Sequence, residues 1–451
     1  MGEFLPTIAV LLIVWALALR FMRNYSAEER PLLWASLAAH QFSSIAYILV
    51  CKYYYGYGDM LSYHSHGIVI ADRMRSDFWE VTPAVIGLIF HANRPVPVPL
   101  LILNGSSGTM QGISGIGAYC LFDSLYAICA VIAAGAFFSK VAFYRLAREE
   151  LPHLSPRQLL WSCTLVPSAV FWSSSLLKEP IAMIGFLFAL RAIQHILHRR
   201  QLLKATVTLC AGLTLVVLTK GYIAPVLAAG SAAWFYAKRI RERSADIVFQ
   251  FGRVVFVIGA AAVLISLTGL LLPLFAVDSV QEVLATQQAA SASVDANSNY
   301  SLGAGTGSAS AQLAMAPLAL FTALFRPLLF EARNPLMLAN ALENAAYLLA
   351  VIWIPFRRGL PGTVAALFRW PFLSFCLLFV VAFGTFTALG STNLGALSRY
   401  RTPLVPFLAT LLVALLSKKA DIRERAPAQS TVPLTMTSVQ APGLLSRKPI
   451  A

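Results

Sequence analysis

Two charged residues, Lys178 and Glu179, stand side by side in the stretch VPSAVFWSSSLLKEPIAM, which is apolar on both sides of them. Ionisable groups within apolar segments of a membrane protein are costly and often functional. A plain alternative is a snorkelling turn, in which both side chains reach water at the headgroups at little cost. The pair therefore marks either a turn between two helices or part of a site at the mouth of a helical bundle, where Glu179 is a candidate catalytic acid.

A second stretch, YYYGYGDMLSYHSHG, places Asp59 between glycines and aromatic residues and follows it with Tyr63, His64 and His66. A carboxylate in such a loop can act as a general base, or it can bind a divalent ion together with imidazoles. Mg²⁺ and Mn²⁺ are the candidate ions, and the sequence leaves open whether a metal binds at all. The alternative is structural, because tyrosines at this density also form aromatic belts at membrane surfaces.

Lysine and arginine recur at three further turns. The segments are TKGYIAP, FRPLLFEARNPLMLANALENAAYL and LGALSRYRTPLVPFL, with Lys220 in the first, Arg326, Glu331 and Arg333 in the second, and Arg399 and Arg401 in the third. Together with Lys178 these cations would form a ring that suits a lipid phosphate or pyrophosphate, since both side chains bind phosphate well. For any single one of them, ordinary phospholipid anchoring is the alternative.

Two acids are expected inside helices, Asp123 in GAYCLFDSLYAICA and Glu343 at the start of the helix that follows Arg333. A carboxylate within a span usually faces a partner or a wet cavity. Either acid can serve the site or pair structurally with an arginine of the ring.

The elements that carry these residues are predicted to be membrane helices. The chain is 58% hydrophobic and 12% charged with a mean hydropathy of +0.70, far too apolar for a soluble domain. Apolar runs predict an all-α, polytopic bundle of about eleven transmembrane helices, because lipid-exposed backbone must pair internally. The expected helices are 4–21, 33–51, 114–137, 158–175, 180–197, 205–219, 222–237, 254–274, 335–355, 372–390 and 403–417.

The basic clusters between these runs predict the orientation. Assigning them all to the cytoplasm satisfies the positive-inside rule and places the N-terminus outside and the C-terminus inside. The net charge of +15 is then a topology signal, and no nucleic-acid partner is expected. The bundle is expected to cover 1–425, with a disordered cytoplasmic tail at 426–451. External segments 52–113 and 275–334 contain apolar stretches too short to span, which predict interfacial helices capping an active site.

Four islands of the chain resemble a known group of proteins. GDMLSYH, VPSAVFWSSSLLKEP, RPLLFEARNPLMLANALE and RYRTPLVPFL, in this order between about 50 and 410, resemble bacterial membrane proteins found with exopolysaccharide and O-antigen assembly. The organisation is similar to that of the C-type glycosyltransferases, which use polyprenyl-phosphate-linked sugars. One difference is that Asp59 follows the second expected span, whereas these enzymes commonly place the acid after the first.

The resemblance implies glycosyl transfer on the outer face of a bacterial inner membrane. Asp59 would be the base or help to hold a divalent cation, and Lys178, Arg326, Arg399 and Arg401 would hold the donor phosphate. The partners would be a polyprenyl-phosphate-linked sugar, a glycan or lipid acceptor, and polysaccharide export machinery. Three alternatives stay open: a polysaccharide polymerase or ligase using lipid-pyrophosphate-linked oligosaccharides, a flippase for the lipid-linked sugar, and a structural scaffold.

Overall fold

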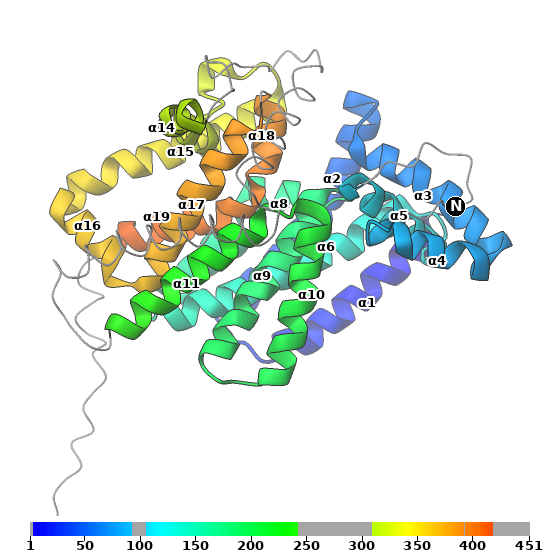
Figure 1. Cartoon of the computed structure of the whole chain (residues 1–451), viewed down its shortest axis with the longest axis horizontal. Helices are drawn as coiled ribbons and strands as arrows, with labels where there is room; N and C mark the ends of the chain where they lie inside the picture. The colour runs from blue at the N-terminus through cyan, green and yellow to red at the C-terminus, as the bar shows by residue number, and fades with distance from the viewer. Residues whose placement is uncertain (1–2, 93–104, 242–308, 392, 418–451) are drawn as a thin grey trace, which may run out of the picture. The chain divides into compact units, whose positions relative to one another are not determined.

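The computed structural model describes residues 3–92, 105–241, 309–391 and 393–417, and these residues form helices without a β-strand (Figure 1). The expected helix at 254–274, part of the expected external segments and the expected tail at 426–451 lie outside the described residues. For the described part of the chain, the predicted all-helical class is confirmed.

Seven described helices are long and apolar enough to cross a membrane. They are α1 (Phe4–Met22), α2 (Arg30–Leu49) with its π-helical extension η1 (Val50–Tyr55), α6 (Leu125–Glu150), α9 (Lys178–Leu197), α10 (Leu202–Lys220), α15 (Pro335–Arg358) and α17 (Pro371–Leu389). An eighth candidate is a bent pair, α18 (Leu394–Tyr400) and the helix that follows it, which meet at 44°. The second arm comprises η4 (Thr402–Leu404) and α19 (Val405–Leu416). The chain is therefore a multi-pass membrane protein, but the expected count of about eleven spans is not confirmed.

One expected span, 114–137, is broken between α5 (Gly105–Cys120) and α6. Phe122 and Asp123 take positive φ values of 51° and 60° there, which an L-residue in a helix does not adopt. Ser124 then begins the next helix, and its hydroxyl accepts a hydrogen bond from the backbone N–H of Ala127 at 3.2 Å. The expectation that Asp123 lies inside a helix was therefore wrong.

A second expected span, 158–175, is divided into α7 (Pro156–Thr164) and α8 (Pro167–Trp172). Pro167 has no N–H with which to continue α7, and it holds the preceding Val166 in an extended conformation with ψ 122°. After α8 the chain continues through the buried, non-helical residues 173–177, and α9 begins directly afterwards. Lys178 and Glu179 thus occupy the first turn of a long helix.

Helices also form at the two apolar stretches expected in the external segments. The first of these segments contains α3 (Asp59–Ser76) and α4 (Phe78–Ile89), and the second contains α14 (Ala309–Phe325) and η3 (Leu329–Glu331). Asp77 caps α4 by accepting a hydrogen bond from the backbone N–H of Glu80 at 3.1 Å. The remaining described helices are α11 (Ile223–Arg241) and α16 (Leu360–Arg369).

The α9–α10 hairpin is held together by two glycines. A Cβ atom on Gly185 would lie 2.5 Å from the carbonyl oxygen of Gly212, so the two backbones approach more closely than any side chain allows. This close antiparallel packing returns the end of α10 to the start of α9. Lys220, the last residue of α10, consequently lies beside Glu179.

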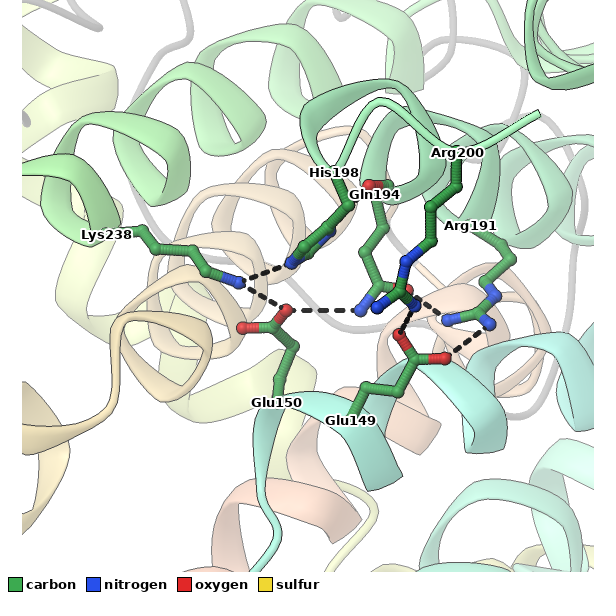
Figure 2. Close-up of polar contacts among 7 residues, drawn as sticks. All are labelled: Glu149, Glu150, Arg191, Gln194, His198, Arg200 and Lys238. Carbon is green, nitrogen blue, oxygen red and sulfur yellow. Dashed lines mark hydrogen bonds and ion pairs between the residues drawn. The ribbon is translucent and has the colours of Figure 1, made fainter. Parts of the chain in front are cut away.

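The opposite ends of these helices are joined by a polar network (Figure 2). Its members are two acids of α6 and five residues from α9, the loop between α9 and α10, and α11, namely Glu149, Glu150, Arg191, Gln194, His198, Arg200 and Lys238. Arg191 lies 2.6 Å from Glu149, and Lys238 lies 2.8 Å from Glu150. Because the C-terminal ends of α6 and α9 meet here, the two helices run in the same direction and both begin at the other end of the bundle.

Aromatic packing fills the centre of the bundle. The rings of Phe186, Phe379 and Phe407, which come from α9, α17 and α19, lie with centroid separations of 4.8 to 5.4 Å. Buried phenylalanines contribute both apolar area and ring–ring attraction. The C-terminal helices are thereby packed against α9, which brings α18 and its arginine close to the start of α9.

Candidate functional site

An ion pair joins two of the predicted site residues. Asp59 is the first residue of α3 and follows a turn in which Gly56 and Gly58 take φ values of 73° and 146°, conformations that favour glycine. Its Oδ2 atom lies 2.8 Å from Nη1 of Arg399, which is on α18 near the other end of the sequence. The glycine-flanked turn therefore presents its carboxylate to a residue that the sequence could not assign to it.

Arg399 also approaches a second carboxylate. Its Nε atom lies 3.4 Å from Oε1 of Glu179, and the same oxygen lies 3.1 Å from Nζ of Lys220. The side chains of Glu179 and Lys220 are only 2% and 8% exposed, so this ion pair is shielded from water. One buried acid thus holds two cations from two other helices.

Aromatic rings enclose the cations. Nζ of Lys220 lies 4.1 Å from the ring centroid of Tyr400 and 5.7 Å from that of Tyr222. The guanidinium of Arg399 lies 5.1 Å from the same Tyr400 ring. Cation–π attraction strengthens as water is excluded, so Tyr400 helps to keep both charges in place.

Lys178 and Tyr63 line the same region through Ser107 of α5. Nζ of Lys178 donates a hydrogen bond to Oγ of Ser107 at 2.8 Å, and Lys178 interacts electrostatically with Lys220, Glu179 and Asp59. Burial and the nearby charge of Asp59 raise the pKa of Tyr63 to about 12, although its hydrogen bond with Ser107 acts in the opposite direction. The Tyr63 hydroxyl consequently stays protonated at neutral pH and can donate a hydrogen bond.

The five residues Asp59, Lys178, Glu179, Lys220 and Arg399, here called the charged cluster, combine three cations with two carboxylates. A surplus of positive charge in a poorly hydrated place suits an anionic ligand, and a phosphate matches lysine and arginine donors. The cluster draws on α3, α9, α10 and α18, so only the folded bundle assembles it.

Exposure separates the two acids that the sequence predicts as catalytic. The Asp59 side chain is 50% exposed, whereas that of Glu179 is 2% exposed and contacts Lys220 and Arg399. A general base must come within hydrogen-bond reach of the proton that it removes. The geometry favours Asp59 as a base and Glu179 as the group that holds the cations.

In the described part of the second expected external segment, the predicted arginine and glutamate pair with each other. Arg326 forms an ion pair with Glu331, which also accepts a hydrogen bond from the backbone N–H of Leu328 at 2.8 Å. Although partial burial opposes it, the hydrogen bonds from Arg326 and Leu328 hold the pKa of Glu331 below its usual value of 4.5. Arg333 lies exposed in the short stretch between η3 and α15.

Arg401 is buried away from Arg399, with a relative exposure of 1%. Its guanidinium donates a hydrogen bond to the carbonyl oxygen of Ala323 at 3.0 Å, near the end of α14, and another to the side-chain oxygen of Asn344. A cation that satisfies terminal carbonyl groups stabilises a helix end. The contacts of Arg401 are those of a helix cap.

The two acids expected within helices have separate partners. Asp123 forms an ion pair with Arg75 at 2.9 Å in the break between α5 and α6. Glu343 lies inside α15, as expected, and accepts hydrogen bonds from the backbone N–H of Ser168 at 2.9 Å and from the Tyr347 hydroxyl at 2.7 Å. Both acids pair within the fold, and neither contacts the charged cluster.

The histidines after Asp59 point to other partners. Nε2 of His64 lies 2.9 Å from the carbonyl oxygen of Asp123, and Nδ1 of His66 lies 2.7 Å from the side-chain nitrogen of Gln111. Within the described ranges, no group of three or more His, Cys, Asp or Glu side chains is arranged to hold a metal ion. His64 and His66 thus have partners of their own, and the use of Mg²⁺ or Mn²⁺ stays a prediction.

Sequence reasoning missed several residues that shape the cluster. Ser107 lies in a glycine- and serine-rich stretch that carries no distinguishing signal, and Tyr222 and Tyr400 resemble ordinary interfacial tyrosines. Their positions next to Lys220 and Arg399 in sequence were the available signal. A comparison of the chain with models of protein families, with curated proteins and with solved structures finds no match.

Proposed function

We propose that this protein is a membrane glycosyltransferase, which transfers a sugar from a polyprenyl-phosphate-linked donor to a glycan or lipid acceptor. The reaction takes place on the outer face of a bacterial inner membrane, during exopolysaccharide or O-antigen assembly. The observation that carries this proposal is the contact of 2.8 Å between a half-exposed Asp59 and Arg399, beside two lysines at one end of a bundle of membrane helices. A lipid-linked phosphate reaches such a site with its tail still in the bilayer.

The charged cluster divides the chemistry between its members. Lys178, Lys220 and Arg399 bind the donor phosphate, and Glu179 keeps the last two in position. The donor phosphate competes with Asp59 for Arg399, so donor binding removes a cation from the carboxylate and raises its proton affinity. Asp59 is then a stronger base once the donor is bound.

The transfer step follows from these contacts. The acceptor hydroxyl gives its proton to the Asp59 carboxylate while its oxygen forms a bond to the anomeric carbon. The bond from that carbon to the phosphate oxygen breaks, and the lipid phosphate leaves with the electron pair. Lys178, Lys220 and Arg399 stabilise the negative charge that develops on the leaving phosphate.

Substitutions made in the protein in its native host test this proposal. Asp59→Asn and Arg399→Ala are made separately, and surface polysaccharide, lipid-linked precursor in each leaflet and protein level in the membrane are measured. We expect loss of polymer with build-up of lipid-linked sugar in the outer leaflet at normal protein level. Asp72→Asn is the matched control, because Asp72 lies on the same helix, is 64% exposed and pairs with Arg75.

Two results would overturn the proposal. Wild-type polymer from both variants would exclude the charged cluster as the site of transfer, and build-up in the inner leaflet would assign the protein to lipid-linked sugar export. Loss of activity when a chelator is added to membranes would favour a metal-dependent transferase over a polymerase or ligase at the same face. Such a polymerase or ligase would keep its activity in the chelator.

A further inference from the structure

The short helix α8 lies in a buried stretch of chain that leads directly into the charged cluster. Five non-helical residues, 173–177, connect its end to Lys178 and Glu179, and each of the five is at most 1% exposed. Because so few residues separate them, a shift of α8 is passed on to the first turn of α9. The groups that hold α8 therefore bear on the position of Lys178 and Glu179.

The N-terminal end of α8 is held by a carboxylate from α15. Oε2 of Glu343 accepts a hydrogen bond from the backbone N–H of Ser168 at 2.9 Å, and Oε1 accepts one from the Ser168 hydroxyl. The first N–H groups of a helix have no partner within it, and inside a membrane water cannot supply one. Glu343 supplies that partner, and Tyr347 orients the carboxylate by donating to Oε1 at 2.7 Å.

The C-terminal end of α8 is held by a lysine from α6. Nζ of the fully buried Lys140 donates hydrogen bonds to the carbonyl oxygen of Ala169 at 2.8 Å and to Oγ of Ser173 at 2.9 Å. Its third contact, at 2.9 Å, is Nε2 of His40. The amino group of Lys140 thus ties the C-terminal end of α8 to His40 of α2.

His40 is the acceptor in that third contact. Its Nδ1 atom lies 2.7 Å from the carbonyl oxygen of Ser36, which can only accept, so Nδ1 carries the hydrogen and Nε2 of a neutral imidazole is left to accept from Lys140. No carboxylate is among the hydrogen-bond partners described for Lys140. The Lys140 amino group is thus directed at the C-terminal end of α8.

The two side chains match the ends of a helix, because one accepts hydrogen bonds at its start and the other donates them at its end. A helix presents unpaired N–H groups and partial positive charge at its start, and unpaired C=O groups and partial negative charge at its end. Glu343 lies at the start of α8 and Lys140 at its end. A six-residue helix that begins at Pro167 and is followed by five non-helical residues has few hydrogen bonds of its own, so these side chains carry much of its anchoring.

Helix α8 also touches the other side of the cluster. The rings of Phe171 and Trp172 pack on Tyr47 with centroid distances of 5.4 and 5.6 Å, and Tyr47 interacts electrostatically with Arg399. In addition, α8 packs against η4, which begins three residues after Arg399 in the chain. Helix α8 is thus connected along the chain to Lys178 and Glu179, and it contacts Tyr47 and η4, which lie near Arg399.

We propose that Lys140 and Glu343 are a pair of positioning residues, which anchor the two ends of α8 and thereby set Lys178 and Glu179 in the charged cluster. They touch neither donor nor acceptor. Their role in placing the chain stands on the contacts above, and their effect on transfer rests on the glycosyltransferase function proposed here.

A cysteine reporter tests the placement independently of activity. Ser175→Cys is introduced in a chain whose exposed Cys120 and Cys210 are replaced by serine, because the hydroxyl of Ser175 is buried without a hydrogen-bond partner among the described residues. The rate of reaction with a membrane-permeant maleimide is then compared with and without Lys140→Met or Glu343→Ala. We expect each variant to react at least about tenfold faster, since loss of an anchor raises local opening of the segment.

Controls separate placement from general loosening. Ser139→Ala changes the neighbouring buried side chain of α6, whose hydroxyl bonds within its own helix, and is expected to leave the rate unchanged. Ala133→Cys, a fully buried position of α6, is the second reporter and is expected to stay unreactive in both variants. Glu343→Gln keeps an acceptor oxygen for Ser168 and is expected to react at an intermediate rate.

The outcomes are distinct. Unchanged labelling at position 175 in both variants would overturn the proposal, and so would faster labelling at positions 133 and 175 alike. If labelling at 175 rises and polymer synthesis falls at normal protein level, both the anchoring and its link to transfer are supported. If labelling rises while a measured transfer activity is unchanged, the anchoring is upheld but the link to transfer is overturned.

Discussion

Lys220 lies 3.1 Å from Glu179, and both side chains are almost excluded from solvent. Removing one partner of a buried ion pair leaves an unpaired charge, which typically costs about 3–5 kcal/mol. Glu179→Gln is therefore expected to destabilise the protein by an amount in this range, measured by thermal unfolding in detergent. Lys220→Met combined with Glu179→Gln should recover part of the loss, because the double variant leaves no lone charge between these two positions.

Glu149→Gln is the matched control for that experiment. This carboxylate also pairs with cations, Arg191 and Arg200, but it is 37% exposed. Exposed ion pairs contribute about 0–1 kcal/mol. An equal loss of stability in Glu149→Gln and Glu179→Gln would contradict the expectation that the buried pair contributes more to the free energy of unfolding than the exposed one.

Arg399→Lys tests whether one guanidinium must serve two carboxylates. Nη1 and Nε of Arg399 contact Asp59 and Glu179, and a lysine ammonium is a compact point charge that cannot reproduce this fork. We expect transfer activity to fall by about a hundredfold or more, the typical effect of losing one preorganised charge-stabilising donor. Initial rates in membranes with a lipid-linked donor provide the measurement, and activity near wild type would refute the requirement for a bridging arginine.

Arg401→Ala is expected to impair folding and not donor binding. The buried guanidinium donates to the carbonyl oxygen of Ala323 and to Asn344, and hydrogen bonds to charged groups each contribute about 1.5–3 kcal/mol. Reduced protein level and a lowered midpoint of thermal unfolding are the expected results. Asn344→Ala should have a smaller effect in the same direction. A fully stable Arg401→Ala protein with weakened donor binding would restore the phosphate-binding role that the sequence predicts.

Glu331 is expected to make stability depend on pH under acidic conditions. Although partial burial opposes it, hydrogen bonds from Arg326 and Leu328 lower its pKa in the folded state below 4.5. A depressed folded-state pKa means that the contribution of Glu331 is fully present above the unfolded value and is lost as the pH falls through the folded value. The difference in unfolding midpoint between wild type and Glu331→Gln should be constant near neutral pH and disappear in acid. A difference that grows as the pH falls would contradict the lowered pKa of Glu331 in the folded state.

Much of the charged cluster was predictable residue by residue, but not as a set. Asp59, Lys178, Glu179, Lys220 and Arg399 stand out because charges are rare in apolar runs, where each one is costly. The same reasoning singles out Arg326, Arg401, Asp123 and Glu343, each of which pairs with other residues of the fold. Rarity identifies a residue with a role, and it does not tell a helix cap from a ligand-binding group.

The helical class and the candidate spans followed from the sequence, because lipid requires long apolar stretches with paired backbone groups. The breaks did not, since Asp123 and Pro167 lie in runs whose average hydropathy is that of a continuous span. Hydropathy averages over a window, whereas a break depends on one residue and on the side chains that satisfy the opened backbone.

The sequence by itself determined that this is a chain of membrane helices with a few conspicuous charges between and within them. Only the tertiary structure decided that Arg399 meets Asp59 and Glu179, that Arg401 caps α14, and that Lys140 and Glu343 hold α8. The physical reason is that these contacts join residues far apart in the chain. They depend on how helices pack, as at Gly185 and Gly212, and local composition carries no record of that packing.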